Sequence, residues 1–367
     1  MNTDISKYTD EALALLSSLI ETPRKSREET LAADIMEQWM KHRSLSPQRV
    51  GNNLLLVASG YDSRRRTVML NAHIDTVRPV ATWTREPYRA VIEGDRLYGI
   101  GSNDCGGGLV TLLQAFRILS SEPRDYNLLY LASCEEEVSG TGGIRSVIPL
   151  LPDLLSTPAD KLHANTVAVV GEPTAMQPAV AEKGLMVLDM TAHGVSGHAA
   201  RNEGVNAIYT ALDDILWLRD YRFEHVSPFL GAVKMTLTVV NAGTQHNVIP
   251  DECRMVVDIR SNEFYTNEEI FDIIKANVKA DIKARSFHLR SSHIPLDHPL
   301  VERCRAMGMI PFGSPTLSDQ ALMPWLSLKL GPGDSSRSHS ADEYICRSEI
   351  ADALEKYLLL LRDLDLD

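Results

Sequence analysis

The chain opens with an apolar pattern that has the period of an α-helix. Between Thr9 and Pro23 the apolar residues recur at helical spacing: Ala12, Leu13, Leu15, Leu16, Leu19 and Ile20. Because a proline cannot continue a helix, we predict an amphipathic helix that ends before Pro23.

Later segments have the pattern of buried strands. Four of them are short, apolar and bounded by polar or glycine-containing turns: Leu54–Val57, Val68–Asn71, Leu128–Ser133 and Val167–Val170. A helical pattern at Gly107–Ser120 lies among them, and Leu326–Leu330 is predicted as a further strand. Strands that alternate with helices indicate an α/β domain with a mixed, largely parallel sheet and helices on both faces.

The pattern changes between residues 181 and 293. The predicted elements there are a strand (Met186–Ala192), a helix (Val205–Leu218), two strands (Val233–Val240 and Arg254–Ile259), a helix (Asn267–Ile282) and a strand (Ser286–Arg290). This β-α-β-β-α-β order is typical of a ferredoxin-like α+β domain. We therefore predict that a small domain of residues 181–293 is inserted into a larger domain of residues 1–180 and 294–367.

Composition and charge exclude several classes of protein. The 367 residues are 44% hydrophobic and 23% charged, close to the average of soluble globular proteins. We find neither an export leader nor an apolar run near the roughly 20 residues of a membrane span, so we predict a cytoplasmic protein without a membrane partner. The formal net charge of −12 disfavours binding to nucleic acid. The five cysteines lack a Cys-x-x-Cys pair, as expected of reduced thiols.

Polar residues follow three of the predicted strands. His73 and Asp75 come after the second strand, Glu135-Glu136-Glu137 after the third and Glu172 after the fourth. Since ligand sites in open α/β sheets form outside the carboxyl ends of the strands, we expect these residues to converge in one crevice. The plainer interpretations are that His73 and Asp75 cap a strand-to-loop turn and that the three glutamates form a solvated acidic turn. Adjacent carboxylates repel unless a cation or a shared proton separates them, and oxygen and nitrogen donors without thiolate fit zinc, with cobalt or manganese as substitutes.

A glycine-rich turn places one more carboxylate before a predicted helix. Residues 99–108 read Gly-Ile-Gly-Ser-Asn-Asp-Cys-Gly-Gly-Gly and contain Asp104. Glycines let a backbone approach a bound group closely, so a phosphate-binding loop is an alternative. That alternative is disfavoured because the Lys-Ser/Thr ending of a phosphate loop is missing and the dinucleotide-binding spacing does not follow a strand correctly.

Together these motifs resemble those of the co-catalytic zinc hydrolases that include acetylornithine deacetylase, succinyl-diaminopimelate desuccinylase, aminoacylase and glutamate carboxypeptidase. The resemblance spans nearly the whole chain, and its motifs occur in order: His-x-Asp at 73–75, Gly-Ser-Asn-Asp around Asp104, Glu-Glu at 136–137, Gly-Glu-Pro-Thr at 171–174, Gly-His-Ala at 197–199, Asn-Val-Ile-Pro at 247–250, Asp-Ile-Arg at 258–260, and Gly-Pro-Gly-Asp with His339. It implies a zinc-exopeptidase-like catalytic domain with an inserted lid or dimerisation domain.

The resemblance also implies a ligand set for two zinc ions in each chain. Asp104 would bridge the two ions. His73 and Glu172 would complete one position, and Glu137 and His339 would complete the other.

Catalytic roles follow from the same resemblance. Glu136 would be the general base that takes a proton from water and returns it to the departing amine. This assignment aligns Glu135-Glu136-Glu137 with Asp-Glu-Glu in the family, so that Glu135 replaces the aspartate. An alignment shifted by one residue is the alternative. Asp75 would orient His73, and the peptide bond after Asp104 would be cis.

The inserted domain is expected to supply three further site residues. His198 would stabilise the oxyanion, and such enzymes usually supply this residue to the partner subunit, which implies a homodimer formed through the inserted domain. Asn247 and Arg260 would contact the substrate, with the guanidinium paired to its free carboxylate. The plainer interpretations are a polar turn at His198 and a surface strand residue at Arg260.

Some positions depart from the family pattern. Ser318-Asp319 continues as Gln320-Ala321-Leu322 where the family often has an arginine, so contacts to the acyl or side-chain end of the substrate stay open. A proline common in relatives is also absent after His198. Trp325 is interpreted as a core residue rather than a pocket residue.

The most specific hypothesis is deacylation of an N-acyl amino acid, with N-acetylornithine or a related N-acyl-ornithine or N-acyl-citrulline of arginine biosynthesis as the first choice. Length and motif set look most like acetylornithine deacetylase. Succinyl-diaminopimelate desuccinylase, an aminoacylase or a dipeptidase would use the same zinc core. A non-catalytic relative that binds amino acids is a remote alternative, because the whole set of ligand-type residues is retained.

Overall fold

In the computed structural model, residues 3–201 and 203–366 are described and form two compact units. Unit 1 comprises Met1–Val180, Ile294–Phe312 and Ser318–Asp367, and unit 2 comprises Ala181–His293 and Gly313–Leu317. The short segment Gly313–Leu317 thus groups with unit 2, although the sequence pattern assigns it to the larger domain. Each unit is described by itself below.

Four parallel strands form the centre of a mixed sheet, which confirms the predicted fold class. In spatial order they are β6 (Asn127–Ser133), β3 (Thr67–His73), β7 (Thr166–Val170) and β17 (Leu326–Lys329). Antiparallel strands flank them: β1 (Gln48–Val50) and β2 (Asn53–Val57) beyond β6, and β8 (Ala179–Glu182) and β15 (Ser292–His293) beyond β17. A further strand, β16 (Phe312–Ser314), pairs with β8. The central strands are buried on both faces, which explains their nearly continuous apolar sequence.

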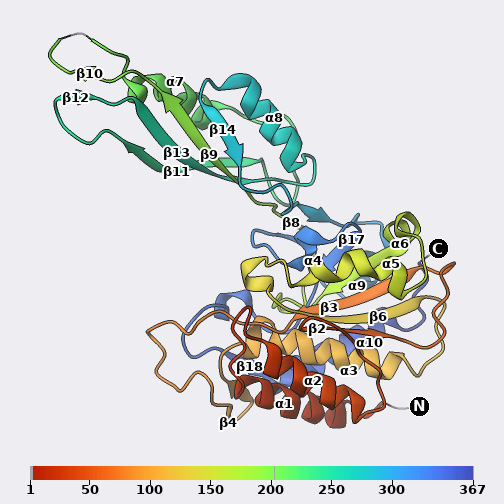
Figure 1. The fold of residues 1–367 in the computed structure, drawn as a ribbon. Helices are drawn as coiled ribbons and strands as arrows, with labels where there is room; N and C mark the ends of the chain where they lie inside the picture. The colour runs from red at the N-terminus through yellow and green to blue at the C-terminus, as the bar shows by residue number, and fades with distance from the viewer. Residues whose placement is uncertain (1–2, 202, 367) are drawn as a thin grey trace. The chain divides into compact units, whose positions relative to one another are not determined.

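Helices cover both faces of this sheet (Figure 1). One face carries α1 (Ile5–Ile20), α2 (Thr30–Lys41), α3 (Gly108–Leu119) and α10 (Arg347–Leu361), and the other carries α4 (Ile144–Val147), α5 (Leu151–Leu154) and α6 (Ala159–Asn165). A further helix, α9 (Pro299–Ala306), contacts α10. Trp325 is only 7% exposed and lies in the core beneath α4 to α6, so its interpretation as a core residue is confirmed.

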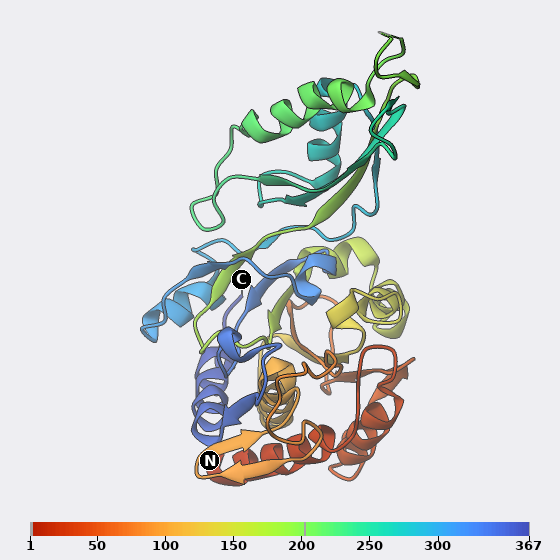
Figure 2. The same cartoon turned by 90° about the vertical axis from the view of Figure 1, so that its left-hand side faces the viewer.

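One small feature of unit 1 has no counterpart in the sequence-based prediction. The strands β4 (Val91–Glu93), β5 (Arg96–Tyr98) and β18 (Tyr344–Cys346) form a separate three-stranded sheet. Figure 2 shows the β4–β5 hairpin beside α1. These strands have three residues each, too few for an alternating pattern to stand out.

Unit 2 has the strand order of a ferredoxin-like domain. Its elements are β9 (Met186–His193), α7 (Ala207–Asp220), β11 (Lys234–Ala242), β13 (Glu252–Arg260), α8 (Asn267–Asn277) and β14 (Asp281–Ala284), with a two-stranded ribbon of β10 (Gly197–His198) and β12 (Val248–Ile249). The four long strands are antiparallel in the order β11-β13-β9-β14. Alternate residues of β9 and β13 enter the core under α7 and α8.

The predictions for the end of this domain are wrong in detail. The predicted helix at Asn267–Ile282 is too long, because α8 ends at Asn277. The predicted strand at Ser286–Arg290 does not form; β14 comes earlier, at Asp281–Ala284.

A buried carboxylate on α7 explains why α8 ends early. Asp214 is 2% exposed and accepts hydrogen bonds from the backbone N–H groups of Lys279 (2.9 Å) and Ala280 (2.8 Å). These two N–H groups are therefore not used in a helix, and the following residues pair with β9 instead. Asp214 lies about 65 residues away in the sequence, so the local pattern does not reveal it.

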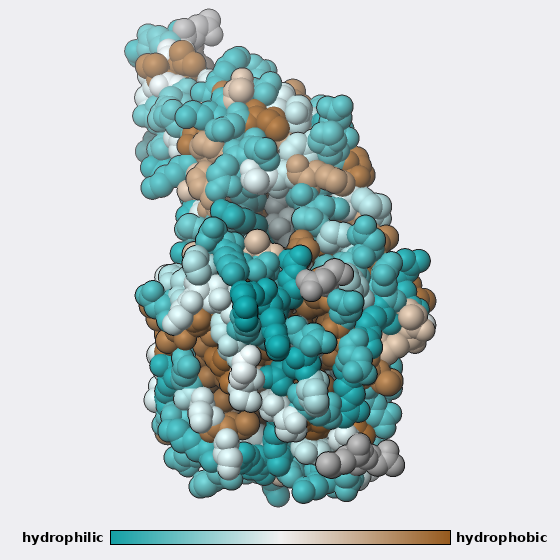
Figure 3. Space-filling model, turned by 90° about the vertical axis from the view of Figure 1, so that its right-hand side faces the viewer, coloured by the Kyte–Doolittle hydropathy of each residue, from teal (hydrophilic) through white to brown (hydrophobic). Residues whose placement is uncertain are grey.

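Figure 3 shows hydrophilic residues over most of the visible face, with hydrophobic residues in small separate groups. In the described part of the chain no helix has the length and apolar character that crossing a membrane requires.

Candidate metal centre

The parallel strands of unit 1 end at the same level and deliver polar residues to one place. His73, the last residue of β3, is level with Ser133, the last residue of β6. Val170, the last residue of β7, is level with Asn71 of β3. The chain therefore leaves all three strands at one edge of the sheet. The acidic residues that follow β6 and β7 lie directly above that edge.

Three side chains gather around the imidazole of His73. Its Nε2 atom lies 3.3 Å from Asp104 Oδ1, 3.7 Å from Glu172 Oε1 and 3.8 Å from Glu136 Oε2. The imidazole is 1% exposed, so these contacts are made inside the protein. His73, Asp104 and Glu172 thus offer one nitrogen and two oxygen donors to a common point.

A second group forms on the other side of Asp104. His339 Nε2 lies 2.9 Å from Glu137 Oε2 and 3.6 Å from Asp104 Oδ2. The two carboxylate oxygens of Asp104 therefore face different histidines, Oδ1 towards His73 and Oδ2 towards His339. This is the arrangement of a carboxylate that bridges two cations.

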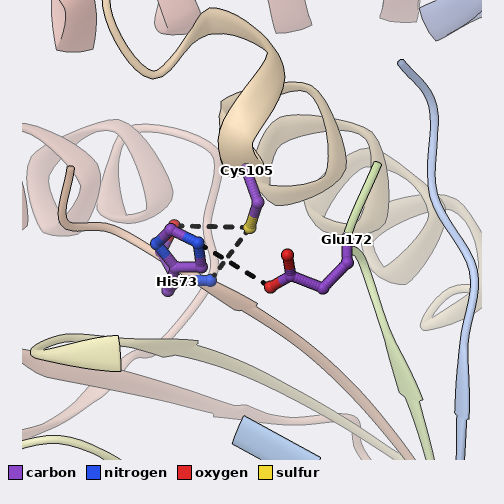
Figure 4. Close-up of side chains that lie close together, drawn as sticks. All are labelled: His73, Cys105 and Glu172. Atoms are coloured by element: carbon purple, nitrogen blue, oxygen red, sulfur yellow. Dashed lines mark hydrogen bonds and ion pairs between the residues drawn. The ribbon is translucent and has the colours of Figure 1, made fainter. Parts of the chain in front are cut away.

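Cys105 lies close to the first group but is a poor ligand. His73, Cys105 and Glu172 point towards one another from different segments (Figure 4), with potential donor atoms within 4.8 Å. The Cys105 sulfur accepts a hydrogen bond from the backbone N–H of His73 (3.2 Å), and burial raises the pKa of the thiol to about 12. A protonated thiol does not bind metal well. The peptide bond between Asp104 and Cys105 is cis, as the family resemblance implies.

Asp75 holds two of the site's loops together. The Nδ1 atom of His73 lies 2.9 Å from the Asp75 carbonyl oxygen and 3.5 Å from its carboxylate, which suits a tautomer with Nε2 free to act as a ligand. The buried Asp75 carboxylate also accepts hydrogen bonds from the backbone N–H groups of Glu136 (3.1 Å) and Glu137 (3.2 Å). One side chain thus sets the position of both the histidine loop and the acidic loop.

Glu343, which the sequence analysis does not single out, holds the turn that carries Asp104. Its buried carboxylate accepts three backbone hydrogen bonds, from Gly101 (2.9 Å), Asn103 (2.8 Å) and Asp104 (2.8 Å). Burial raises the pKa of Glu343 to about 7. The available sequence signal is weak: an acidic residue four positions after His339.

Asn103 connects the same turn to the segment before His339. Its side-chain amide donates to the carbonyl oxygen of Asp334 (3.0 Å), and its side-chain oxygen accepts from the Asp334 backbone N–H (2.9 Å). The side chain of Asn103 therefore fixes the segment that supplies Asp104 to the backbone of the segment that supplies His339.

The buried carboxylates perturb one another. Burial is the main cause that raises the pKa of Glu136 well above its usual range, with the charges of Glu172 and Glu137 adding to it. Burial likewise raises the pKa of Glu172 to about 8. Such crowded carboxylates are stabilised by a cation between them. The oxygen and nitrogen donors and the bridging position of Asp104 thus fit a pair of divalent metal ions.

The other predicted site residues belong to unit 2. His198 is exposed on β10, and Asn247 lies beside it, since the Asn247 carbonyl oxygen accepts a hydrogen bond from Ala199 (3.1 Å). Arg260 is at the opposite end of β13 from this ribbon, about 26 Å along the strand, and its guanidinium is paired with Asp258 (2.9 Å). Within unit 2 the structure therefore brings His198 and Asn247 together but not Arg260.

The model of peptidase family M20/M25/M40 matches residues 69–363. The chain belongs to this family. Membership of this family makes the protein a hydrolase, and it supports a metal-dependent amidohydrolase.

Curated relatives align over most of this M20 chain. A peptidase M20 domain-containing protein of Schizosaccharomyces pombe is 28% identical over 361 residues, covering 95% of this chain and 83% of that protein. Acetylornithine deacetylase of Proteus mirabilis is 26% identical over 343 residues (85% and 84%), and a putative succinyl-diaminopimelate desuccinylase of Mycobacterium tuberculosis is 27% identical over 361 residues (95% and 98%).

Solved structures share the M20 fold. Aminopeptidase PepT from Bacillus cereus has a TM-score of 0.74 at 14% identity, covering 96% of this chain and 98% of that chain. The YXEP protein of Bacillus subtilis, described as a dinuclear metal binding peptidase from the M20 family, has a TM-score of 0.69 at 16% identity (98% and 99%).

The protonation of His339 gives a first prediction. A hydrogen bond to Glu137 raises the pKa of His339 from 6.5 to about 9 in the metal-free protein. This interaction stabilises the fold fully below about pH 6.5 and is lost as the pH rises through about 9. In the presence of a chelator, the unfolding temperature of the wild type should fall as the pH rises from about 6.5 to about 9. The unfolding temperature of His339→Gln should fall less over the same pH interval. Thermal unfolding of both proteins across the interval measures the difference, and identical profiles would contradict the assignment.

Proposed function

We propose that this protein removes the acyl group from an N-acyl amino acid by hydrolysing its amide bond, at a site that holds two metal ions. The observation that carries the proposal is the position of Asp104 between two histidines, with each carboxylate oxygen facing one of them. A carboxylate that is merely solvated in a turn would face water and would not lie between two histidines.

The residues around Asp104 divide into two metal positions. His73, Asp104 and Glu172 would hold one ion, and Asp104, Glu137 and His339 would hold the other. Zinc fits these donors, and cobalt or manganese are possible substitutes. When bound, such a pair lowers the pKa of bound water and polarises the acyl carbonyl. The description of the YXEP protein as dinuclear supports this proposal.

Glu136 has the properties of the general base. Its carboxylate lies at the edge of the first group, 3.8 Å from His73 Nε2, and burial raises its pKa, so it holds a proton more readily than an ordinary glutamate. It can accept a proton from water and deliver it to the departing amine. The neighbouring Glu135 instead accepts a hydrogen bond from the backbone of Gly142 (3.2 Å), which supports the register with Glu136 as the base.

The substrate is proposed from the relatives and from unit 2. The name of the Proteus relative favours N-acetylornithine or a related N-acyl-ornithine or N-acyl-citrulline, and the name of the Mycobacterium relative supports a succinylated diamino acid as the second candidate. His198 is proposed to stabilise the oxyanion, and Asn247 and Arg260 to contact the substrate. For Arg260 this requires that its guanidinium exchange Asp258 for the substrate carboxylate.

A panel of N-acyl amino acids tests this function. We expect release of free amine from N-acetylornithine and from related N-acyl-ornithines or N-acyl-citrullines, with slower turnover of succinyl-diaminopimelate, acyl-methionine and dipeptides. Prolonged chelation should abolish this activity, and zinc or cobalt should restore it, since the two metal positions supply the reactive water. Full activity in protein shown to be metal-free would refute the metal mechanism. Cleavage of dipeptides alone would shift the proposal to a peptidase.

The three consecutive glutamates provide a test of individual roles. Glu136→Ala should keep both metal ions but lose turnover by at least about 10²–10⁴-fold, the usual contribution of a positioned acid or base. Glu137→Ala should lose one metal ion, and Glu135→Ala serves as the matched control with near-normal metal content. Metal analysis and turnover of the three purified variants decide the register. The base would be misassigned if Glu135→Ala gave the phenotype expected of Glu136→Ala.

We also propose a homodimer formed through unit 2, with cytoplasmic location and without a nucleic-acid or membrane partner. The outer surface of α7 exposes apolar side chains in helical register: Ile208, Tyr209, Leu212 and Leu216. On the neighbouring edge strand β11, Val239 and Val240 are also exposed. Exposed apolar groups of this kind favour a contact with a second copy.

If each subunit supplies His198 to its partner's metal site, two inactive variants should complement each other. In a mixed dimer of Glu136→Ala and His198→Ala chains, one site receives an intact Glu136 from its own chain and an intact His198 from the other. Random exchange should then restore about one quarter of wild-type activity, because half of the dimers carry one complete site. Activity is measured after subunit exchange has been demonstrated with tagged chains. No recovery would show that His198 does not act across subunits.

A further inference from the structure

A buried arginine beneath the metal centre has no role in the mechanism proposed above. Arg24 lies in the loop between α1 and α2 and is 1% exposed. Its Nη1 atom donates to the carbonyl oxygen of Ile74, and its Nη2 atom donates to the carbonyl oxygen of Gly101 (2.9 Å). Ile74 stands directly after His73, and Gly101 begins the turn that leads to Asp104. One guanidinium group therefore connects two of the three segments that supply ligands to the proposed first metal position.

The backbone around Arg24 is fixed to the same region. The N–H of Thr76 donates to the carbonyl oxygen of Arg24 (3.0 Å), and the N–H of Ser26 donates to the carbonyl oxygen of Thr76 (3.4 Å). The Ser26 hydroxyl donates to the Asp75 carboxylate (2.7 Å). The loop thus pairs with the residues that follow His73, and this pairing aims the Arg24 side chain at the two carbonyl groups.

The turn before Asp104 is held from two sides by opposite charges. Arg24 binds the carbonyl oxygen of Gly101, while Glu343 accepts hydrogen bonds from the N–H groups of Gly101, Asn103 and Asp104. Gly101 has a φ of +68°, and a Cβ atom at this position would lie 2.6 Å from Arg24 Nη2. A glycine is therefore needed for the guanidinium to approach so closely.

A role in core packing alone does not account for the buried Arg24. Burial lowers the pKa of its guanidinium, and the charges of Glu343, Asp75 and Asp104 act against that effect. A buried cation is costly to desolvate, and its Nε atom has no hydrogen-bond partner within the described residues. The planar fork, however, can hold two carbonyl oxygens at a fixed separation, which a lysine ammonium cannot do.

We propose that Arg24 is a positioning residue for the metal position formed by His73, Asp104 and Glu172. It keeps the segments of His73 and Asp104 at the spacing that this position requires. The position formed by Glu137 and His339 shares only Asp104 with it and is less dependent on Arg24. This inference rests on the proposed metal pair, and its readout is metal affinity rather than turnover.

Titration of cobalt(II) into metal-free protein tests the proposal. The wild type should bind two equivalents per chain. Arg24→Met should bind one equivalent with about 10- to 100-fold lower affinity, the usual loss when a group that orients metal ligands is removed, and should retain the other. Arg24→Lys keeps the charge but not the fork, and should show a smaller loss at the same equivalent.

Arg124→Met is the matched control. Arg124 also donates to backbone carbonyl oxygens, those of Leu119, Ser120, Glu122 and Ser59, but it does so at the far end of α3. Its replacement removes the same chemistry and should lower the unfolding temperature without a change in either cobalt affinity.

The outcomes separate the two proposals. Unchanged cobalt binding in Arg24→Met would overturn the positioning role, and so would equal losses in Arg24→Met and Arg124→Met, since these would reflect general destabilisation. If Arg24→Met does not fold, Arg24→Lys decides, and two unchanged equivalents would overturn the role. A wild type that binds no cobalt would refute the metal pair itself.

Discussion

Mutual repulsion between buried carboxylates is the constraint on which the centre of this protein depends. The parallel strands β3, β6 and β7 end at one level, and the chain beyond them supplies acidic side chains to a single place. Burial raises the pKa of Glu136 and of Glu172, and the charges of the neighbouring carboxylates add to this effect. The surrounding structure must therefore hold them at short distances against their electrostatic preference. Asp75 does so by accepting hydrogen bonds from the backbone of the acidic loop, and Glu343 does so for the turn of Asp104.

Much of the fold follows from local patterns in the sequence. The central strands are almost continuously apolar because helices cover both faces of the sheet, so their positions were predictable to within one or two residues. The polar residues that follow them stand out against that background. The bounds of α8 and β14 were not predictable, because the side chain that ends α8 is Asp214 on a different helix. A local pattern contains no information about such a partner.

The candidate site shows the same division. His73, Asp104 and the paired glutamates could be picked out because ligand-type residues occur next to strand ends and in a glycine-rich turn. Arg24 and Glu343 could not, since their partners are backbone N–H and carbonyl groups, which every residue carries. An arginine in a loop after a helix is usually interpreted as a surface residue. Only the folded chain shows that it is buried beneath the ligands.

The two histidines of the site differ sharply in exposure. The side chain of His73 is 1% exposed, whereas that of His339 is 55% exposed and comes from a residue with a φ of +56° in a surface loop. One half of the centre is therefore built into the interior during folding, and the other half is closed by a residue at the surface. In the proposed metal pair, the position that includes His339 would therefore be the one more open to solvent, and its ion would exchange more readily than the ion beside His73.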